Sequence, residues 1–529
     1  MSTATVYFLL PEIVLITAAV VIYIAGAFFQ TDKTWRWLAL AGIVLAIVCL
    51  NAQPTGTDSG GMISDGFTVY IRWLVLGLSL LLVLLNFQPI PNGGTPEALG
   101  SFLLVIAGAM LLVSANDLIL LFVSLELISI PTYILLYLGP SVVGTQESSA
   151  KYFYLSVLAS AILLYGFSFI YGVAGTTDLK GIGTALANQQ NMTHGFDNLA
   201  KLALVLTFAG LSFRLAAVPF HFYAPDVYQG TSNQNAALLS VIPKVAALVV
   251  LVRLVWATMP ELELFAWRIS VVVAILTMTL GNTMALWQDN LRRLLAYSSI
   301  GHAGYLLIGL AVALATRTHP SSYWDGIGAM LFYFCVYAAA TIGTFALLEF
   351  LGQSQKRMDS IEELAGLCRT RPAAAAMIAI FMFSLTGIPP LAGFWGKLQL
   401  FGSALNVDAQ ITAAGNMRIW FITLAILGVL NAAISAGYYL RIVGVMYFRA
   451  PSSSHRAEGG LGACTAAVAC TLFTIIIGLY PGPLVRTSNS ARPEKPQIQK
   501  NQTTADLPSF NEPSPHRKPP LQPAPDPKR

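Results

Sequence analysis

Long apolar stretches alternate with short polar connections along the chain, up to about residue 480. A helix that spans a membrane needs about 20 mostly apolar residues. By this measure the pattern predicts roughly fourteen spanning helices, and hence an all-α integral membrane protein. The predicted spans lie near 7–29, 36–50, 67–88, 100–115, 117–138, 152–173, 201–222, 235–256, 265–286, 296–315, 327–350, 373–403, 417–447 and 461–480.

Proline interrupts two of these helices. Pro219 lies near the end of the seventh span (201–222), and Pro389 and Pro390 lie inside the twelfth (373–403). Proline removes a backbone donor and clashes with the preceding turn, so both helices should break or kink there. Freed backbone polar groups are tolerated in a membrane only where they are buried in protein or face a cavity. Both breaks therefore indicate an internal polar site.

The two interrupted helices are five spans apart, which indicates an internal repeat with its site at the breaks. We expect two five-helix units, helices four to eight (100–256) and nine to thirteen (257–450). Five is odd, so the second unit should be inverted relative to the first. A three-helix segment (1–99) should precede them and one helix (451–480) should follow. The alternative is that two proline-rich helices coincide by chance.

The last part of the chain, 481–529, has a different composition. It is rich in Pro, Ser, Asn, Gln and Lys and has few large apolar residues. Such a segment cannot bury enough surface to offset its ordering entropy, so we expect it to be disordered.

Composition supports a membrane protein and excludes some other classes. Of 529 residues, 56% are hydrophobic and only 10% are charged, whereas soluble domains carry about 25% charged residues. The net charge of +5 gives no indication of a nucleic-acid partner. The five cysteines are scattered without a C-x-x-C pair, which argues against zinc or iron–sulfur binding. The N-terminus has no basic leader, so the first helix should be retained.

Basic residues in the loops predict the orientation. They follow the first, ninth, eleventh and thirteenth spans, which places them on one side of the membrane. The positive-inside rule makes that side cytoplasmic and puts both termini on the outer side. The residues concerned are Lys33, Arg36, Arg292, Arg293, Lys356, Arg357, Arg369, Arg371, Arg449 and Arg456.

Several ionisable side chains lie inside predicted spans. A charge at the centre of a membrane helix costs roughly 2.5–3.5 kcal/mol on insertion scales, and such a series commonly marks a proton relay. The alternative is a set of structural pairs that hold helices together. The series consists of Glu126, Arg214, Lys244, His302 and Lys397.

These residue types suit proton transfer. A lysine in apolar surroundings can load and release protons near neutral pH, and a carboxylate that approaches or leaves it gates that proton. Histidine titrates at physiological pH after a small shift. Other charges lie nearer span ends: we expect Arg72 and Arg253 to be interfacial anchors, Glu12 to reach the surface or a neighbouring subunit, and Asp117 to cap a helix.

Five motifs carry a family resemblance: PEIVL (11–15), ESSAKYFYLSVLASAILLYG (147–166), FRLAAVPFHFYAPDVYQG (213–230), NLRRLLAYSSIGHAGYLLIG (290–309) and GIPPLAGFWGKLQLF (387–401). Taken together, they resemble subunit N of the bacterial proton-pumping NADH:quinone oxidoreductase, respiratory complex I. The resemblance runs from the first to the fourteenth predicted helix, and the DVYQG motif after the broken helix favours subunit N over its antiporter-like sister subunits.

The resemblance implies a fourteen-helix subunit with two inverted repeats and a central hydrated axis. The family's key groups fall on Glu126, Lys244 and Lys397, and His302 would link the half-channels. The helix-seven position, usually lysine in this family, is Arg214. Arginine is effectively never deprotonated, so Arg214 can hold Glu126 and tune Lys244 but should not carry a transferred proton.

The function implied by the resemblance is proton translocation across the cell inner membrane, driven by NADH oxidation and quinone reduction in other subunits. The implied partners are other membrane-arm subunits, including antiporter-like sisters, and the lipid bilayer. We expect no cofactor in this chain; NADH, FMN, iron–sulfur clusters and quinone would bind to partner subunits. One alternative is the large subunit of a multi-subunit Na⁺/H⁺ antiporter, and another is a membrane scaffold.

Overall fold

The structure is a computed structural model in which helices form almost every element. It describes residues 3–29, 31–53, 61–87, 94–139, 143–188, 194–259, 262–317, 325–352, 358–407, 417–451 and 459–493. Within these ranges no strand forms, and there are only isolated β-bridges between loop residues. The predicted all-α fold is therefore confirmed.

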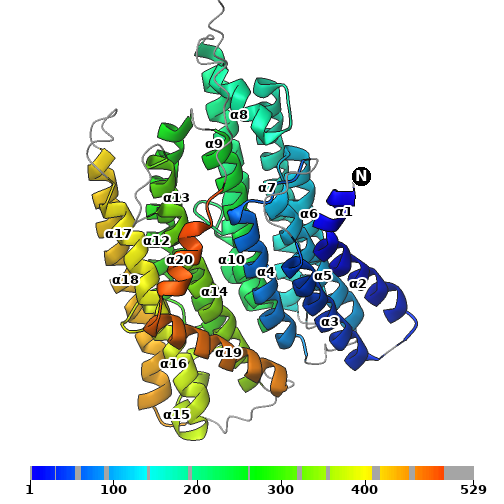
Figure 1. Cartoon of the computed structure of the whole chain (residues 1–529). Helices are drawn as coiled ribbons and strands as arrows, with labels where there is room; N and C mark the ends of the chain where they lie inside the picture. Colours follow the sequence, from blue (N-terminus) through cyan, green and yellow to red (C-terminus); the bar gives the residue numbers. More distant parts are fainter. Residues whose placement is uncertain are drawn as a thin grey trace, which may run out of the picture. The chain divides into compact units, whose positions relative to one another are not determined.

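The helices follow the predicted order of spans (Figure 1). Those before residue 260 are α1 (Thr3–Phe8), α2 (Leu10–Gly26), α3 (Asp32–Asn51), α4 (Gly66–Leu85), α5 (Thr95–Ser114), α6 (Leu118–Tyr137), α7 (Val143–Ala174), α8 (Leu179–Asn188), α9 (His194–Leu215), α10 (Tyr223–Gly230), α11 (Asn233–Val250) and the π-helix η2 (Leu251–Thr258). Those after it are α12 (Glu263–Leu286), α13 (Leu291–Ala315), α14 (Gly326–Leu351), the 3₁₀ helix η4 (Ile361–Leu364), α15 (Leu367–Thr370), α16 (Pro372–Thr386), α17 (Ala392–Leu405), α18 (Met417–Phe448), α19 (Gly460–Leu479) and α20 (Gly482–Ser490).

The number of spans agrees with the prediction. Within the described residues, 12 helices are long and apolar enough to cross a membrane, and α2 and α16 are shorter apolar helices. The three central helices, α11 with η2, α13 and α14, are buried along their whole apolar length. By contrast, α7, α18 and α19 bury only one third of theirs. Polar side chains on the central helices are therefore shielded from lipid.

The seventh predicted span is broken, as expected. Helix α9 ends at Leu215 and α10 begins at Tyr223, with Pro219 in the link between them. Ala216 takes a φ of 55°, a left-handed conformation that costs a residue with a Cβ roughly 1–2 kcal/mol. The backbone N–H of Val218 donates to the Thr277 hydroxyl of α12 at 3.1 Å. The freed backbone is thus satisfied inside the protein, as a membrane requires.

The twelfth predicted span is broken as well, between α16 and α17. Gly387 ends α16 in the left-handed region, with φ of 94°, and its N–H donates to the Phe383 carbonyl at 3.0 Å. Glycine adopts this helix-ending conformation without steric cost. The break leaves the Thr386 carbonyl free to accept from a side chain, and Lys397 uses it.

The two halves share an order of elements. In the first, α7 packs against α9 and α10, the two parts of a broken helix; in the second, α14 packs against α16 and α17. This agrees with two five-helix units. Their inverted relationship, and the division of the chain at residues 99, 256, 450 and 480, stay predictions.

One correction concerns the predicted disordered tail, 481–529. Its first part is helical: α20 packs against α14 and α4 (Figure 1). Arg492, just beyond it, donates from Nε to Asp325 at the start of α14, at 3.0 Å. The segment is short and polar, so it carries no signal of a membrane span, and contacts with helices far away in the sequence order it. Residues from 494 onward lie outside the described ranges.

Candidate functional site

Glu126 and Arg214 lie together at the first break. Glu126 projects from α6, and Arg214 comes from the last turn of α9, just before the chain leaves the helix. Arg214 Nη2 donates to Glu126 Oε1 at 3.3 Å, and Nη1 donates to the Ser129 hydroxyl at 2.6 Å. The Ser160 hydroxyl of α7 donates to the same carboxylate oxygen at 2.6 Å. The pair is therefore held from three helices.

The two partners differ in their exposure. The Arg214 side chain is 4% exposed and the Glu126 side chain 24%. The cation is thus fixed inside the protein, whereas the carboxylate lies at the edge of the buried region. An acid in that position can lose its contact with arginine at lower cost than a fully buried one.

Lys244 lies in the middle of α11 and is 1% exposed. Its Nζ donates to both the carbonyl and the hydroxyl of Ser299 on α13, and to the Tyr337 hydroxyl of α14 at 3.4 Å. Tyr337 in turn donates to the Ser240 carbonyl at 3.2 Å. No carboxylate pairs with Lys244 in the described part of the chain, so its ammonium form depends on neutral oxygens alone.

His302 lies one turn beyond Ser299 on α13 and is also buried. Its Nδ1 is 2.6 Å from the Tyr333 hydroxyl of α14, and its Nε2 is 2.9 Å from the Tyr439 hydroxyl of α18. The Tyr439 hydroxyl also bonds the Ser298 hydroxyl. Each imidazole nitrogen thus has a hydroxyl partner that can either donate or accept.

Lys397 lies on α17 beside the second break and is 5% exposed. Its Nζ donates to the Thr386 carbonyl at 2.9 Å, the oxygen freed where α16 ends. The same Nζ lies over the Tyr305 ring, 4.9 Å from its centroid. The two proline breaks therefore hold a charged side chain each, Arg214 at one and Lys397 at the other.

Aromatic side chains fill the space between the two lysines. The His302 ring is 4.9 Å from the Tyr337 ring on the Lys244 side. It is 5.9 Å from the Tyr305 ring on the Lys397 side. Lys244, His302 and Lys397 thus lie in one buried series, without a continuous chain of direct hydrogen bonds between them.

The serine and tyrosine hydroxyls that bond Lys244 and His302 are further functional candidates, and the pattern of charged residues in the sequence did not indicate them. Tyr333 and Tyr337 lie four residues apart, so they share one face of α14. Ser298 and Ser299 precede His302 in the same turn region of α13. The i, i+4 spacing of tyrosines in an otherwise apolar helix was the available signal.

The predicted interfacial anchors were wrong. Arg72 and Glu12 form a buried ion pair at 2.5 Å, with side chains 2% and 3% exposed. Arg253, on η2, donates to both carboxylate oxygens of Asp65 at 2.6 and 2.7 Å, deep inside the protein. Both arginines are buried because each meets a carboxylate from a distant part of the sequence. The predicted cap was confirmed, since Asp117 accepts from the N–H of Ile119 at 2.7 Å.

A polar cluster near the N-terminal ends of α7 and α13 ties three helices together. Asp226 on α10 accepts from Lys151 of α7 at 2.7 Å and from Arg293 of α13 at 2.6 Å. Burial alone would raise the pKa of the Asp226 carboxyl, but the hydrogen bonds from Lys151 and Arg293 lower that pKa below its ordinary value.

Among the residues that the structure describes, no group of three or more His, Cys, Asp or Glu side chains is arranged to hold a metal. The five cysteines are free thiols.

Fold and site together define a class, a polytopic helical membrane protein with ionisable side chains at two proline-broken helices and between them. The family model described as NADH:quinone oxidoreductase/Mrp antiporter, TM, matches residues 115–423. NADH-quinone oxidoreductase subunit N of Paramagnetospirillum magneticum is 35% identical over 496 residues, which cover 91% of this chain and 96% of that protein. The subunit of the same name in Rhodospirillum rubrum is 37% identical over 448 residues, covering 83% of this chain and 87% of that one.

Solved structures agree with this classification. A chain in the structure of respiratory complex I from Thermus thermophilus with bound aureothin is similar, with 30% identity and a TM-score of 0.73. The match covers 90% of this chain and 98% of that one. The chain belongs to the family of NADH-quinone oxidoreductase subunit N, an antiporter-like family of multi-pass membrane proteins. The family predicted from the sequence is thus confirmed.

Proposed function

We propose that this chain is a membrane-arm subunit of an NADH:quinone oxidoreductase in the cell inner membrane, and that it translocates protons driven by quinone reduction in other subunits. One observation carries the proposal: Lys244, His302 and Lys397 form a single buried series whose hydrogen-bond partners are hydroxyls and carbonyls. The names of the relatives support the association with NADH and quinone.

In this proposal Glu126 and Arg214 form a charge-pair switch. Arg214 keeps its proton and supplies a fixed positive charge. When Glu126 moves away from Arg214, the unpaired cation opposes a proton on Lys244. When the pair is closed, that repulsion is reduced.

Lys244 is the central proton carrier. Ser299 and Tyr337 contact its amine directly and can rotate their hydroxyl groups as a proton passes. His302 accepts the proton at one nitrogen and releases it from the other, and Lys397 carries it toward the exit side. Within the described residues no direct hydrogen bond links His302 to either lysine, and its nitrogens bond Tyr333 and Tyr439 instead. Bridging water therefore completes the path in this proposal.

The remaining assignments follow from the family and the loop charges. The partners are other membrane-arm subunits, including antiporter-like sisters. Redox cofactors belong to other subunits, so this chain itself holds none. Both termini lie on the outer side, since the basic loops are cytoplasmic.

A direct test is to purify the complex through a tag on this chain and reconstitute it in vesicles. Addition of NADH and quinone should then acidify the vesicle lumen, and an uncoupler should abolish the gradient. If the tagged chain purifies without an NADH-oxidising arm, the proposal is wrong.

The main alternative is a subunit of a Na⁺/H⁺ antiporter, since the matching family model includes antiporters of that kind. It predicts proton movement that depends on a sodium gradient and not on NADH. A pure scaffold predicts that neutralising the buried charges affects assembly alone. Protons pumped per electron, measured in assembled variants, separates these alternatives.

A further inference from the structure

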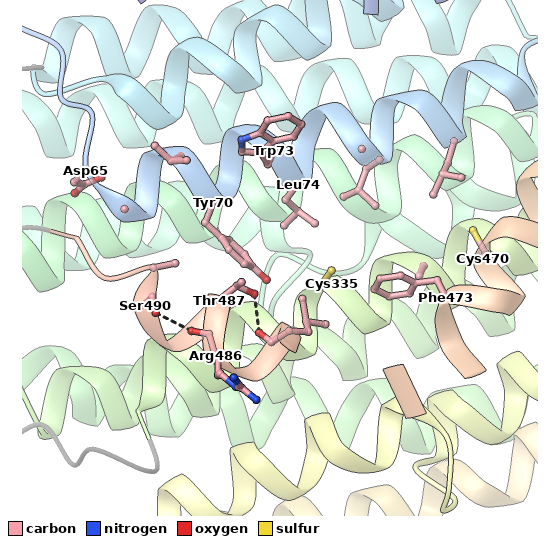
Figure 2. Close-up of a pocket in the computed structure, with 18 of the residues that line it drawn as sticks. Asp65, Tyr70, Trp73, Leu74, Cys335, Cys470, Phe473, Arg486, Thr487 and Ser490 are labelled. Atoms are coloured by element: carbon pink, nitrogen blue, oxygen red, sulfur yellow. Dashed lines mark hydrogen bonds between the residues drawn. The ribbon is translucent and has the colours of Figure 1, made fainter. Parts of the chain in front are cut away.

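A hollow lies apart from the polar series, between α4, α14, α19 and α20. Its volume is about 1080 Å³, at the upper end of the roughly 300–1,000 Å³ typical of ligand pockets. Figure 2 shows Tyr70, Trp73 and Leu74 of α4 along one side of this groove. Phe473 of α19 lies toward its far end. No other site described above uses these side chains.

The two ends of the groove differ in polarity. Thr487 and Ser490 of α20 lie at one end, and both are exposed. Arg486 beside them is exposed too, and no acceptor pairs with its guanidinium in the described part of the chain. From there the lining continues along α4 as far as Leu81 with side chains that are apolar except for the Tyr70 hydroxyl, which is buried.

This polarity gradient follows the depth of the membrane. Helix α20 begins beside the second helix break, where Gly478 lies against Pro390, and it ends beside the first turns of α4 and α14, where Ser490 lies against Gly66 and Asn489 against Gly328. Its C-terminal end therefore marks the membrane-surface end of the groove. The lining runs along α4 from Gly66 to Leu81, about 22 Å at a rise of about 1.5 Å per residue. That depth exceeds half of the roughly 30 Å hydrocarbon core. The groove therefore extends from the surface through one leaflet.

We propose that this groove binds a membrane glycerophospholipid. One acyl chain lies along α4 beside Leu74 and Gly77, and the phosphate is held by Arg486 and Thr487. A cation and a hydroxyl at the surface end complement an anionic phosphate. An apolar channel of leaflet depth complements an acyl chain.

Gly77 gives the acyl chain its space. A Cβ built on Gly77 meets no atom within 4 Å, so the glycine faces the open groove.

The lipid would also support the helix that holds the polar series. Cys335 and Ala339 of α14 line the groove, while Tyr333 and Tyr337 project from that helix toward His302 and Lys244.

The experiment uses phosphatidylglycerol with a photoactivatable diazirine in one acyl chain, incorporated into membranes that contain the complete complex. Peptide mass spectrometry should locate cross-links on α4 and α19, near Trp73 and Phe473. Gly77→Leu adds an apolar side chain on the groove side of α4, where an added Cβ meets no protein atom within 4 Å. Labelling should then fall about tenfold, which corresponds to about 1.4 kcal/mol of binding free energy.

The matched control is Gly172→Leu on the exposed face of α7, where an added Cβ also meets no atom within 4 Å. It should assemble and label like the parent. Labelling of Gly77→Leu at the parental level would overturn the proposal. Cross-links confined to other helices would overturn it too, and would indicate that a neighbouring subunit occupies the groove.

A second comparison tests the phosphate. Diacylglycerol with the same diazirine chain should label the parent less than phosphatidylglycerol does. Arg486→Gln should reduce phosphatidylglycerol labelling to the diacylglycerol level. Arg486 is exposed, so this variant remains informative if Gly77→Leu fails to assemble on a native gel. Equal labelling by both lipids in the parent contradicts recognition of the phosphate.

Discussion

Replacing Arg214 tests whether a fixed positive charge at the first break is required. Its guanidinium bonds Ser129 at 2.6 Å, the Leu125 carbonyl and Glu126 at 3.3 Å, and Ser160 at 3.4 Å. Removing one partner of a buried ion pair costs about 3–5 kcal/mol. Because Glu126 is 24% exposed, it can be hydrated, so we expect Arg214→Gln to cost about 3 kcal/mol, at the lower end.

Arg214→Lys separates charge from hydrogen-bond geometry. Lysine keeps the positive charge but cannot bond Ser129 and Glu126 at once through a rigid fork. We expect Arg214→Lys to assemble and to pump protons as the parent does, and Arg214→Gln to assemble less and to pump fewer protons per electron.

The assay compares three quantities: assembly on a native gel, quinone-linked NADH oxidation, and proton uptake by inverted membranes. Arg418→Gln is the matched control, since Arg418 is exposed at the start of α18. Assembled Arg214→Gln that pumps as many protons per electron as the parent would refute the charge-pair switch. Failure of Arg214→Lys alone would show that the hydrogen-bond fork matters more than the charge.

Three further predictions concern other parts of the chain. Tyr337→Phe keeps the ring beside Lys244 but removes its hydroxyl. Protons pumped per electron should fall, while the protein loses only about 1 kcal/mol of stability. Asp226→Asn should lower the thermal stability of the complex by about 1 kcal/mol or less at neutral pH. Because the folded pKa of Asp226 is lowered, its contribution is lost as pH falls through that pKa, so a fluorimetric melting series should show parent and variant converging below about pH 4. Arg253→Met removes the cation that pairs with the buried Asp65 carboxylate, at a cost of about 3–5 kcal/mol; native gels should show less complex, with normal pumping per electron in what remains.

Much of the fold could be predicted because the signals are local. Apolar length identifies a span from its own residues alone. Both breaks occur where Pro219 and Pro390 indicate, although proline alone does not identify a break, since Pro131 and Pro243 lie inside the continuous helices α6 and α11. The short helices α8 and α20 were missed because they are shorter than a membrane span and obtain their order from contacts with other elements.

The candidate site was predictable only in part. A charge inside an apolar span is conspicuous, so Glu126, Lys244 and Lys397 could be identified directly. The i, i+4 spacing of Tyr333 and Tyr337 was a signal that these tyrosines share one face of their helix, but it did not identify their partners, because a tyrosine in a membrane helix can equally face lipid. Only the packing of α13, α14 and α18 determines which hydroxyl meets the imidazole.

The misjudged arginines illustrate the same limit. Arg72 meets a carboxylate 60 residues away in the sequence, and Arg253 meets one 188 residues away. Both arginines lie near the ends of predicted spans. That position favoured a place at the membrane surface for their side chains, since long cationic side chains usually lie there. A carboxylate supplied by a distant helix instead made burial possible.

The central claim, that Lys244 carries protons, is tested most directly by Lys244→Met in the assembled complex. Methionine has a similar length and keeps the apolar packing of α11, but it cannot hold a proton. Lys33→Met, at an exposed position near the start of α3, is the control. We predict fewer protons pumped per electron for Lys244→Met and an unchanged ratio for Lys33→Met. An unchanged ratio in assembled Lys244→Met would contradict the account.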